Sequence, residues 1–80
     1  MTKFIVIYTK ERNSELKGVF ETLDDAQKCM EDNLEKYFEE ELSVSREEVE
    51  DEIDDEWGIE EKLAWSNLYG RNLDINIFEI

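Results

Sequence analysis

Apolar and β-branched residues alternate near the start of the chain in the two-residue rhythm of a β-strand. Over 3–10, Phe4 and Val6 alternate with residues that are themselves mostly apolar. Because both faces of this strand are apolar, we expect it to be central in a sheet or partly covered by a helix. A polar turn at 11–14 leads to a second strand over 16–21, and a hairpin is the simplest connection between the two.

The alternation returns in the last part of the chain, after Gly58. A strand is expected over 63–69, and a Gly-Arg-Asn turn at 70–72 separates it from a last strand over 73–80. We therefore expect strands at both ends of the chain.

Between these strands, apolar residues recur at spacings of three and four, which predicts an amphipathic helix of about five turns. Thr22 is its expected N-cap, with Asp25 three positions later in a variant of the capping box. Asp24 adds a second acid at the positive end of the helix dipole. The apolar face consists of Leu23, Ala26, Met30, Leu34, Tyr37 or Phe38, and Leu42.

A second helix is predicted after the interruption at 43–45. Ser45 and Glu48 form a capping box, and Gly58 is the expected stop signal. Eight of the ten residues in 47–56 are acidic, and like charges four residues apart oppose helix formation. We therefore expect this helix to be the least stable element. Its narrow apolar stripe consists of Val49, Ile53 and Trp57.

The predicted order is strand, strand, helix, helix, strand, strand. This order defines an α+β fold in which an antiparallel sheet of about four strands carries two acidic helices on one side. With 80 residues the chain has room for one domain, 1–80, and buries only about 60% of the surface of its unfolded state. A core of this size holds no large cavity.

Charge changes the picture more than any motif. The chain has 23 Asp or Glu against 9 Lys or Arg, a net charge of −14, and the segment 21–62 holds 19 of the acids and 4 of the bases. That segment therefore carries −15, and the other 38 residues carry +1. The net charge exceeds the roughly 2 to 8 that serves solubility in a small domain, and its self-repulsion costs stability. We therefore expect the acidic surface to have a use.

The same charge excludes several partners. DNA, RNA and anionic lipid are bound by neutralising phosphates with Lys and Arg, so direct binding of nucleic acid or membrane is not expected. The longest apolar run, residues 4–8, is far shorter than the roughly 20 residues that span a bilayer, and it does not resemble a signal peptide. The single Cys29 cannot form an internal disulfide, which agrees with a reducing compartment. We expect a cytoplasmic protein.

Residues typical of catalytic and cofactor sites are missing from the sequence. There is no histidine, Cys29 falls inside a predicted helix as a small apolar residue, and the three glycines are isolated, so no phosphate-binding loop exists. Carboxylate pairs are plentiful, but so small a chain offers no cleft to shield and tune them. An EF-hand alignment with Gly58 sixth puts Ala64 where the bidentate Glu belongs. We expect no enzymatic activity, no cofactor and no specific metal site.

The predicted helices instead present carboxylates at regular intervals. Residues four apart on a helix lie about 6 Å from each other, comparable to successive phosphates of a nucleic-acid strand. A groove lined with Lys and Arg would bind such rows as it binds phosphates. Trp57 or Tyr37 would add anchors if exposed, although a core position is favoured for both. The predicted partner-binding residues are Glu31, Glu35 and Glu39 on the first helix and Glu47, Glu48, Asp51, Glu52, Asp54, Asp55 and Glu56 on the second.

In size, charge and α+β make-up, the chain resembles small acidic, usually phage-encoded inhibitors that mimic nucleic acid, and the resemblance covers 21–62. They include anti-CRISPR, anti-restriction and DNA-glycosylase-inhibitor proteins. These inhibitors share no diagnostic motif, so no residue role is carried over. The resemblance implies a non-enzymatic inhibitor that blocks the basic DNA- or RNA-binding channel of a host defence enzyme, with a CRISPR effector nuclease as the favoured target. Such a protein would act in the cytoplasm of an infected host cell.

Two other functions agree with the same residues. The protein could be an acidic interaction or regulatory module that binds another basic protein or dimerises through its sheet, where the last strand would offer a free edge. A divalent-cation buffer is the third possibility and would require calcium binding at micromolar strength. Both a monomer and a homodimer are compatible with the sequence.

Overall fold

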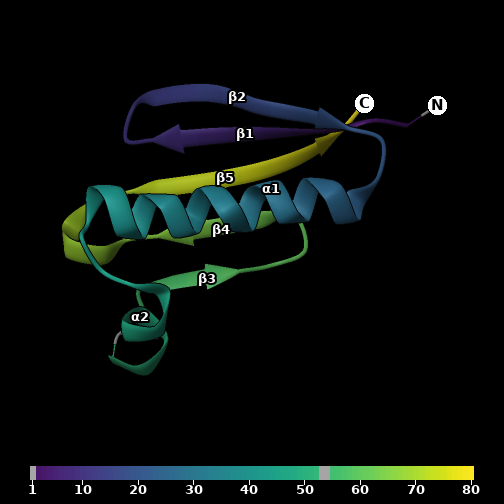
Figure 1. Ribbon diagram of the computed structural model, residues 1–80. Coiled ribbons are helices and arrows are strands. Elements are labelled where there is room, and N and C mark those ends of the chain that lie inside the picture. The colour runs from purple at the N-terminus through teal and green to yellow at the C-terminus, as the bar shows by residue number, and fades with distance from the viewer. Residues whose placement is uncertain (1, 53–54) are drawn as a thin grey trace.

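A five-stranded antiparallel sheet forms the centre of the protein, and one main helix lies across one of its faces (Figure 1). The computed structural model describes residues 2–52 and 55–80. The strand order in the sheet is β2-β1-β5-β4-β3. The strands are β1 (Phe4–Lys10), β2 (Asn13–Phe20), β3 (Trp57–Ile59), β4 (Leu63–Ser66) and β5 (Leu73–Glu79).

The main helix forms as its sequence predicts. In α1 (Leu23–Lys36) the Thr22 hydroxyl accepts a hydrogen bond from the backbone N–H of Asp25 at 3.2 Å, which confirms the N-cap. The helix then widens into a π-helical turn, η1 (Tyr37–Glu41). The predicted helix of about five turns is thus confirmed, with its last turn in the π conformation.

The second helix is shorter than predicted. α2 (Arg46–Glu52) starts where expected, because the Ser45 hydroxyl accepts a hydrogen bond from the N–H of Glu48 at 3.2 Å. Trp57 and Gly58, predicted as its last apolar residue and its stop, instead belong to β3. The α+β class is confirmed, but the sheet of about four strands with two comparable helices is wrong, because the described chain has five strands and one main helix.

Long-range contacts explain why Trp57 lies in a strand. It pairs with Ser66 of β4, and its ring packs edge-on against Phe38 of η1 with 5.8 Å between centroids. Extending α2 instead would have added like-charge repulsion along its acidic face. Ile53, the middle residue of the predicted stripe, lies outside the described residues.

The last strand is central, so the predicted free edge at β5 is wrong. β5 pairs with β1 on one side and β4 on the other, and the edges of the sheet are β2 and β3. The strand predicted over 63–69 ends at Ser66, because a 3₁₀ turn, η2 (Leu68–Gly70), follows with φ of 57° at Tyr69 and 73° at Gly70. This left-handed turn reverses the chain into β5.

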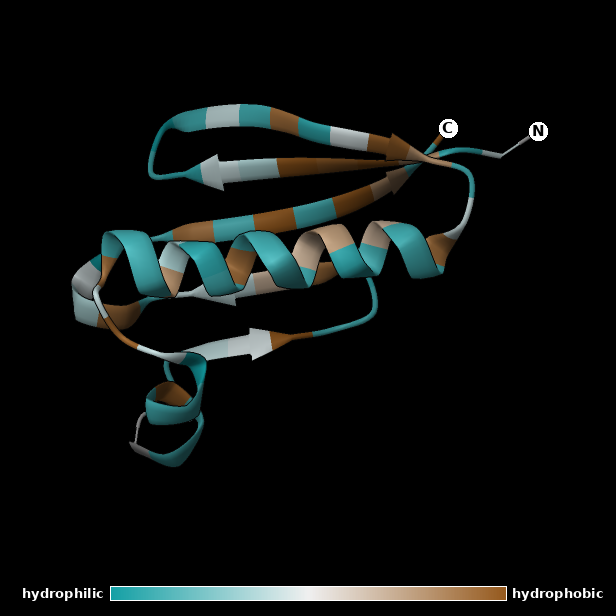
Figure 2. Ribbon diagram, in the orientation of Figure 1, coloured by the Kyte–Doolittle hydropathy of each residue, from teal (hydrophilic) through white to brown (hydrophobic). Residues whose placement is uncertain are grey.

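The hydrophobic core lies between α1 and the sheet. Figure 2 shows apolar residues in succession along β1 and in alternation along β5. Every second residue of β5 faces α1, and Val49 anchors α2 at the margin of the same core. None of the described helices is long and apolar enough to cross a membrane. The buried apolar residues are Val6, Ala26, Met30, Leu34, Tyr37, Phe38, Val49, Ala64, Leu68, Leu73, Ile75 and Ile77.

Candidate acidic interaction surface

The predicted acids of the main helix differ in exposure. Glu31 and Glu35 belong to α1 and are half-buried, whereas Glu39 is exposed in η1. Glu31 and Glu35 are therefore four residues apart in regular α-helix, as predicted. The step from Glu35 to Glu39 enters the π-helical turn and does not have α-helical geometry.

The predicted acids of the second helix divide into two groups. Glu47, Glu48 and Asp51 are exposed on α2, and Glu52 ends that helix. Asp54 lies outside the described residues. Asp55 and Glu56 are exposed, but in a bend before β3, so the prediction that they continue the helical rows is wrong. The rows fail because the chain turns toward β3, where Trp57 joins the sheet and the core.

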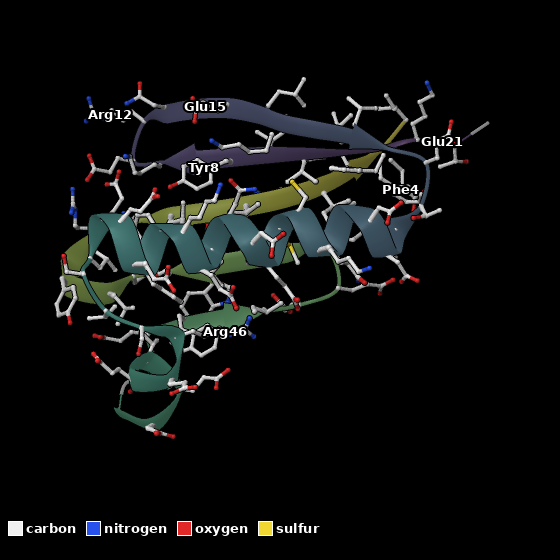
Figure 3. All side chains as sticks on the ribbon, in the orientation of Figure 1. Phe4, Tyr8, Arg12, Glu15, Glu21 and Arg46 are labelled. Carbon is white, nitrogen blue, oxygen red and sulfur yellow. The ribbon has the colours of Figure 1, made fainter. Side chains whose placement is uncertain are left out.

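An open groove joins the two acidic helices. Glu35 and Glu39 line it from α1 and η1, and Glu47 and Glu50 line it from α2. Arg46 lies in the same groove, and Figure 3 shows it between α1 and β3. The acids of two separate segments are thus brought onto one surface, which we call the acidic surface: the exposed carboxylates of α1, η1 and α2.

Arg46 connects the parts of this surface. Its Nη1 donates a hydrogen bond to Glu35 at 3.0 Å and its Nε donates to Glu50 at 3.2 Å. Its guanidinium carbon lies 6.0 Å from the centroid of the Trp57 ring. Burial opposes the charge, but the hydrogen bonds with Glu35 and Glu50 outweigh it and raise the pKa of Arg46. One cation therefore ties α1, α2 and β3 together.

Neither Arg46 nor Glu50 is among the predicted site residues. A net-charge sum registers Arg46 only as one positive charge among many negative ones, so it does not show that this residue pairs with particular acids. An i, i+4 interval from Arg46 to Glu50 was present in the sequence as a signal for that pair. No local pattern points to Glu35, which is eleven positions away.

The two candidate aromatic anchors are part of the core. Tyr37 is 2% exposed and packs against Phe38, and Trp57 is half-buried against the same ring. The core position favoured for both is confirmed. Among the described residues, two other aromatic side chains are exposed: Tyr69 at 60% on the turn between β4 and β5, and Phe78 at 49% on β5.

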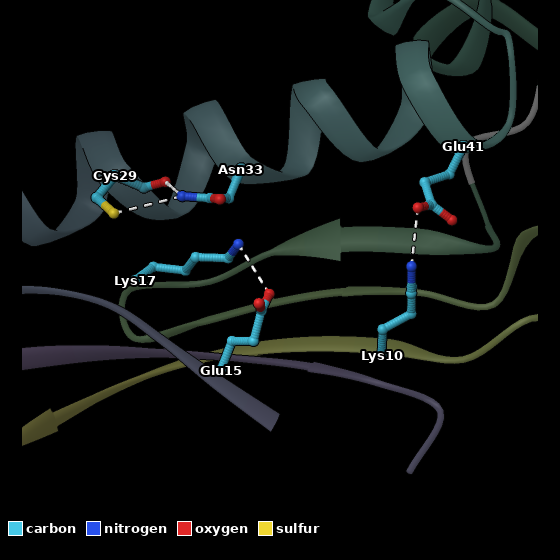
Figure 4. Close-up of polar contacts among 6 residues, drawn as sticks. All are labelled: Lys10, Glu15, Lys17, Cys29, Asn33 and Glu41. Carbon is cyan, nitrogen blue, oxygen red and sulfur yellow. Dashed lines mark hydrogen bonds and ion pairs between the residues drawn. The ribbon is translucent and has the colours of Figure 1, made fainter. Parts of the chain in front are cut away.

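A second polar feature lies between the β1–β2 hairpin and the end of α1. Lys10 donates a hydrogen bond to Glu41 at 2.8 Å, and Lys17 pairs with Glu15 at 2.9 Å (Figure 4). The Lys17 ammonium also lies 4.8 Å from the centroid of the Tyr8 ring. These side chains and Tyr8 line a cleft together with Asn33, Lys36, Tyr37 and Glu40.

The ion pair between Lys10 and Glu41 favours the charged form of both side chains. The hydrogen bond from Lys10 lowers the pKa of Glu41, and the same bond raises the pKa of Lys10. Burial, reinforced by nearby acids, raises the pKa of Tyr8 to about 12. Burial also raises the pKa of the Cys29 thiol, whose sulfur accepts a hydrogen bond from Asn33 at 3.4 Å, so this thiol is not activated as a nucleophile.

The acidic residues do not converge on a cation site within 2–52 and 55–80, where no group of three or more His, Cys, Asp or Glu is placed to hold a metal ion. The carboxylates instead spread over the outer side of the helices.

Comparison of the chain with protein-family models, curated proteins and solved structures finds no match.

Proposed function

We propose that this protein is a non-enzymatic inhibitor whose acidic surface mimics nucleic acid and occupies the basic DNA- or RNA-binding channel of a host defence enzyme, with a CRISPR effector nuclease as the favoured target. The observation that carries the proposal is the concentration of −15 in segment 21–62, against +1 in the rest of the chain. The protein would act in the cytoplasm of an infected host cell.

The placement of the acids supports this proposal. Carboxylates on α1, η1 and α2 border one groove, although they come from segments separated by a loop. Within the helices, acids four residues apart lie about 6 Å from each other, comparable to successive phosphates of a nucleic-acid strand. The field of such a surface steers association with a basic channel and makes the rate sensitive to salt.

The Arg46 contacts support it in a second way. The Arg46–Glu35 ion pair links α2 to α1, and the guanidinium near the Trp57 ring links it to β3, while the Arg46–Glu50 pair lies within α2 itself. The carboxylates are therefore held in place before a partner arrives. A surface that is ordered in advance loses less conformational entropy on binding. Glu47, Glu48 and Asp51 remain exposed on α2, and they are the acids we assign to the strongest contact.

A displacement assay with two matched variants tests the proposal. In the first variant Glu47→Gln, Glu48→Gln and Asp51→Asn neutralise α2, and each change keeps a side chain of similar size. The control, Glu21→Gln with Glu60→Gln and Glu61→Gln, removes the same charge from exposed acids outside the helices. Fluorescent DNA or guide RNA bound to a purified CRISPR effector nuclease is titrated with each protein at low salt.

We expect the wild type to displace the nucleic acid and the α2 variant to require at least about tenfold more protein than the control variant, because contacts between paired charges are lost. Equal potency of the two variants would remove α2 from the interface. If the wild type displaces nothing from CRISPR effectors, restriction enzymes or DNA glycosylases at low salt, the mimic proposal is wrong. Capture of another basic protein from host lysate would then favour the alternative of an acidic interaction module.

A further inference from the structure

The turn between β4 and β5 has a backbone geometry that its sequence does not favour. Tyr69 and Gly70 have φ of 57° and 73°, and the N–H of Arg71 donates a hydrogen bond to the carbonyl of Leu68 at 3.1 Å. Two successive positive φ angles in a turn closed in this way are typical of type I′. The first of the two positions favours Asn, Asp or Gly, because a larger side chain is strained in this conformation. Tyr69 is therefore in an unfavourable conformation.

The Tyr69 side chain contributes little to the folded domain. It is 60% exposed, whereas its neighbour Leu68 is buried in the core. The aromatic pairs and cation–π contacts of the described residues involve other rings. Phe78, the other exposed aromatic, lies in a strand, where aromatic side chains are favoured. Neither packing nor backbone preference accounts for a tyrosine at position 69, and such a conflict with local preference is typical of a functional residue.

The turn lies between the bend before β3 and the β1–β2 hairpin. On one side, the N–H of Asn67 donates a hydrogen bond to the carbonyl of Glu56 at 2.7 Å. On the other side, the N–H of Glu11 donates to the carbonyl of Asn72 at 3.0 Å. Both ends of the turn are thus fixed to neighbouring segments, and Tyr69 projects from a support that is already in place.

The π-helical turn η1 lies at the same end of the molecule. Lys10 of the hairpin donates a hydrogen bond to Glu41 of η1 at 2.8 Å. This bond lowers the pKa of Glu41, and the charge of Arg71, two residues after Tyr69, adds to the effect. The β4–β5 turn, the hairpin and η1 therefore lie close together, at the end of the sheet where the main helix ends (Figure 1).

Carboxylates lie on two sides of the turn. The cations at this end have acidic neighbours, since Lys10 pairs with Glu41 and Arg71 lies 3.9 Å from Glu11. Among the described residues, no ion pair is recorded for the other exposed acids of η1 and of the bend before β3, which are Glu39, Glu40, Asp55 and Glu56. A molecule that contacts the Tyr69 ring therefore also meets unpaired carboxylates, and this charge favours a basic partner.

We propose that Tyr69 is the aromatic anchor of the interface with the target, and that its ring stacks on a planar side chain of the basic channel, an arginine or an aromatic residue, that otherwise stacks on a nucleobase. This inference rests on the proposed function. Channels for single-stranded nucleic acid contain such stacking positions, and tyrosine is enriched among the residues that contribute most to interfaces. The carboxylates then take the place of phosphates, and Tyr69 takes the place of a base.

The stability of the free protein tests the premise without a partner. Because Asn adopts a positive φ more readily than Tyr, Tyr69→Asn should raise the urea midpoint of unfolding by roughly 0.3 to 1 M. Tyr69→Phe keeps the Cβ and the ring and should leave the midpoint within about 0.2 M of the wild type. An equal or lower midpoint for Tyr69→Asn would show that the tyrosine is not costly to the fold, and the inference would lose its basis.

Displacement of nucleic acid tests the contact itself. Fluorescent guide RNA bound to a purified CRISPR effector nuclease is titrated at low salt with the wild type and each variant. We expect Tyr69→Asn to require at least about tenfold more protein than the wild type, and Tyr69→Phe to stay within about threefold, because stacking needs the ring and not the hydroxyl. Phe78→Thr is the matched control, because it removes an exposed aromatic near the far end of β5 and keeps a β-branched residue in the strand. Circular dichroism verifies the fold of each variant.

The outcomes separate this inference from the proposed function. If the wild type displaces the RNA and Tyr69→Asn displaces it equally well, the proposed function stands and Tyr69 is not the anchor. Equal losses for Tyr69→Asn and Tyr69→Phe would exclude stacking of the ring. An equal loss for Phe78→Thr would exclude a contact specific to Tyr69. If the wild type displaces nucleic acid from no candidate enzyme, both the proposed function and the anchor are wrong.

Discussion

Arg46 is the residue whose loss should most clearly reveal how the acidic helices are held. It is the positive charge in the groove between α1 and α2, where Glu35 and Glu50 accept its hydrogen bonds. Arg46→Gln removes the charge and keeps most of the aliphatic stem that packs beside Trp57. The substitution leaves the neighbouring carboxylates to repel each other with no cation between them.

The expected loss of stability follows from these contacts. The Arg46 side chain is 29% exposed, so its two ion pairs are partly screened by water, and such pairs contribute about 0.2 to 1 kcal/mol each. The guanidinium over the indole adds about 0.5 to 1 kcal/mol. Together these give roughly 1 to 3 kcal/mol, which for a domain of this size lowers Tm by roughly 4 to 24 °C.

Thermal unfolding at low and high salt measures this loss. Arg71→Gln is the control, because it also removes one positive charge, and the only ion pair recorded for Arg71 among the described residues is a 3.9 Å contact with Glu11 between exposed side chains. We expect Arg46→Gln to unfold well below the control at low salt and the gap to narrow at 0.5 M NaCl, where repulsion between carboxylates is screened. Equal Tm values for the two variants at low salt would refute the role of Arg46 as the connection between the helices.

Two further predictions concern the sheet. Since burial raises the pKa of Tyr8 to about 12 from 10.0, the unfolded state loses this proton first; stability should therefore fall as pH rises from 10 toward 12. Urea midpoints at pH 9 and 11 measure this loss of stability, and Tyr8→Phe should make the loss smaller. The same loss in wild type and Tyr8→Phe would contradict the role of Tyr8 in this pH dependence. Gly58→Ala should cost roughly 1 to 3 kcal/mol, because its Cβ would meet the Trp65 indole at 2.6 Å. An unchanged urea midpoint would show that this contact relaxes freely.

The elements with local signals could be predicted from the sequence. Thr22 caps α1 through a bond to a residue three positions away, and the apolar spacing of Ala26, Met30 and Leu34 describes the face that the helix buries. The alternation in β1 and β5 likewise needs no knowledge of the partners. In each case the residues that decide the structure are neighbours in the chain.

Trp57 shows where local pattern fails. Its spacing from Val49 fits a helical stripe, but its position is decided by pairing with Ser66 and by contact with Phe38, residues nine and nineteen positions away. The candidate site shares this limit. Acids could be counted along the chain, but the groove at which α1 and α2 meet depends on Arg46 reaching back to Glu35. A sum of charges carries no information about which of them are paired.

The π-helical turn determines the position around the helix axis at which the chain leaves η1 toward α2. In η1 the N–H of Leu42 bonds to the carbonyl of Tyr37, five residues earlier, and the adjacent Tyr37 and Phe38 are both buried. A π-helical turn holds one residue more than an α-helical turn, and each residue of an α-helix turns the chain by about 100°. Removing one residue from 39–41 would therefore rotate the start of the loop to α2 around the helix axis. The orientation of α2 relative to α1 thus depends on the number of residues in the π-helical turn. It does not depend on which acidic residues the two helices carry.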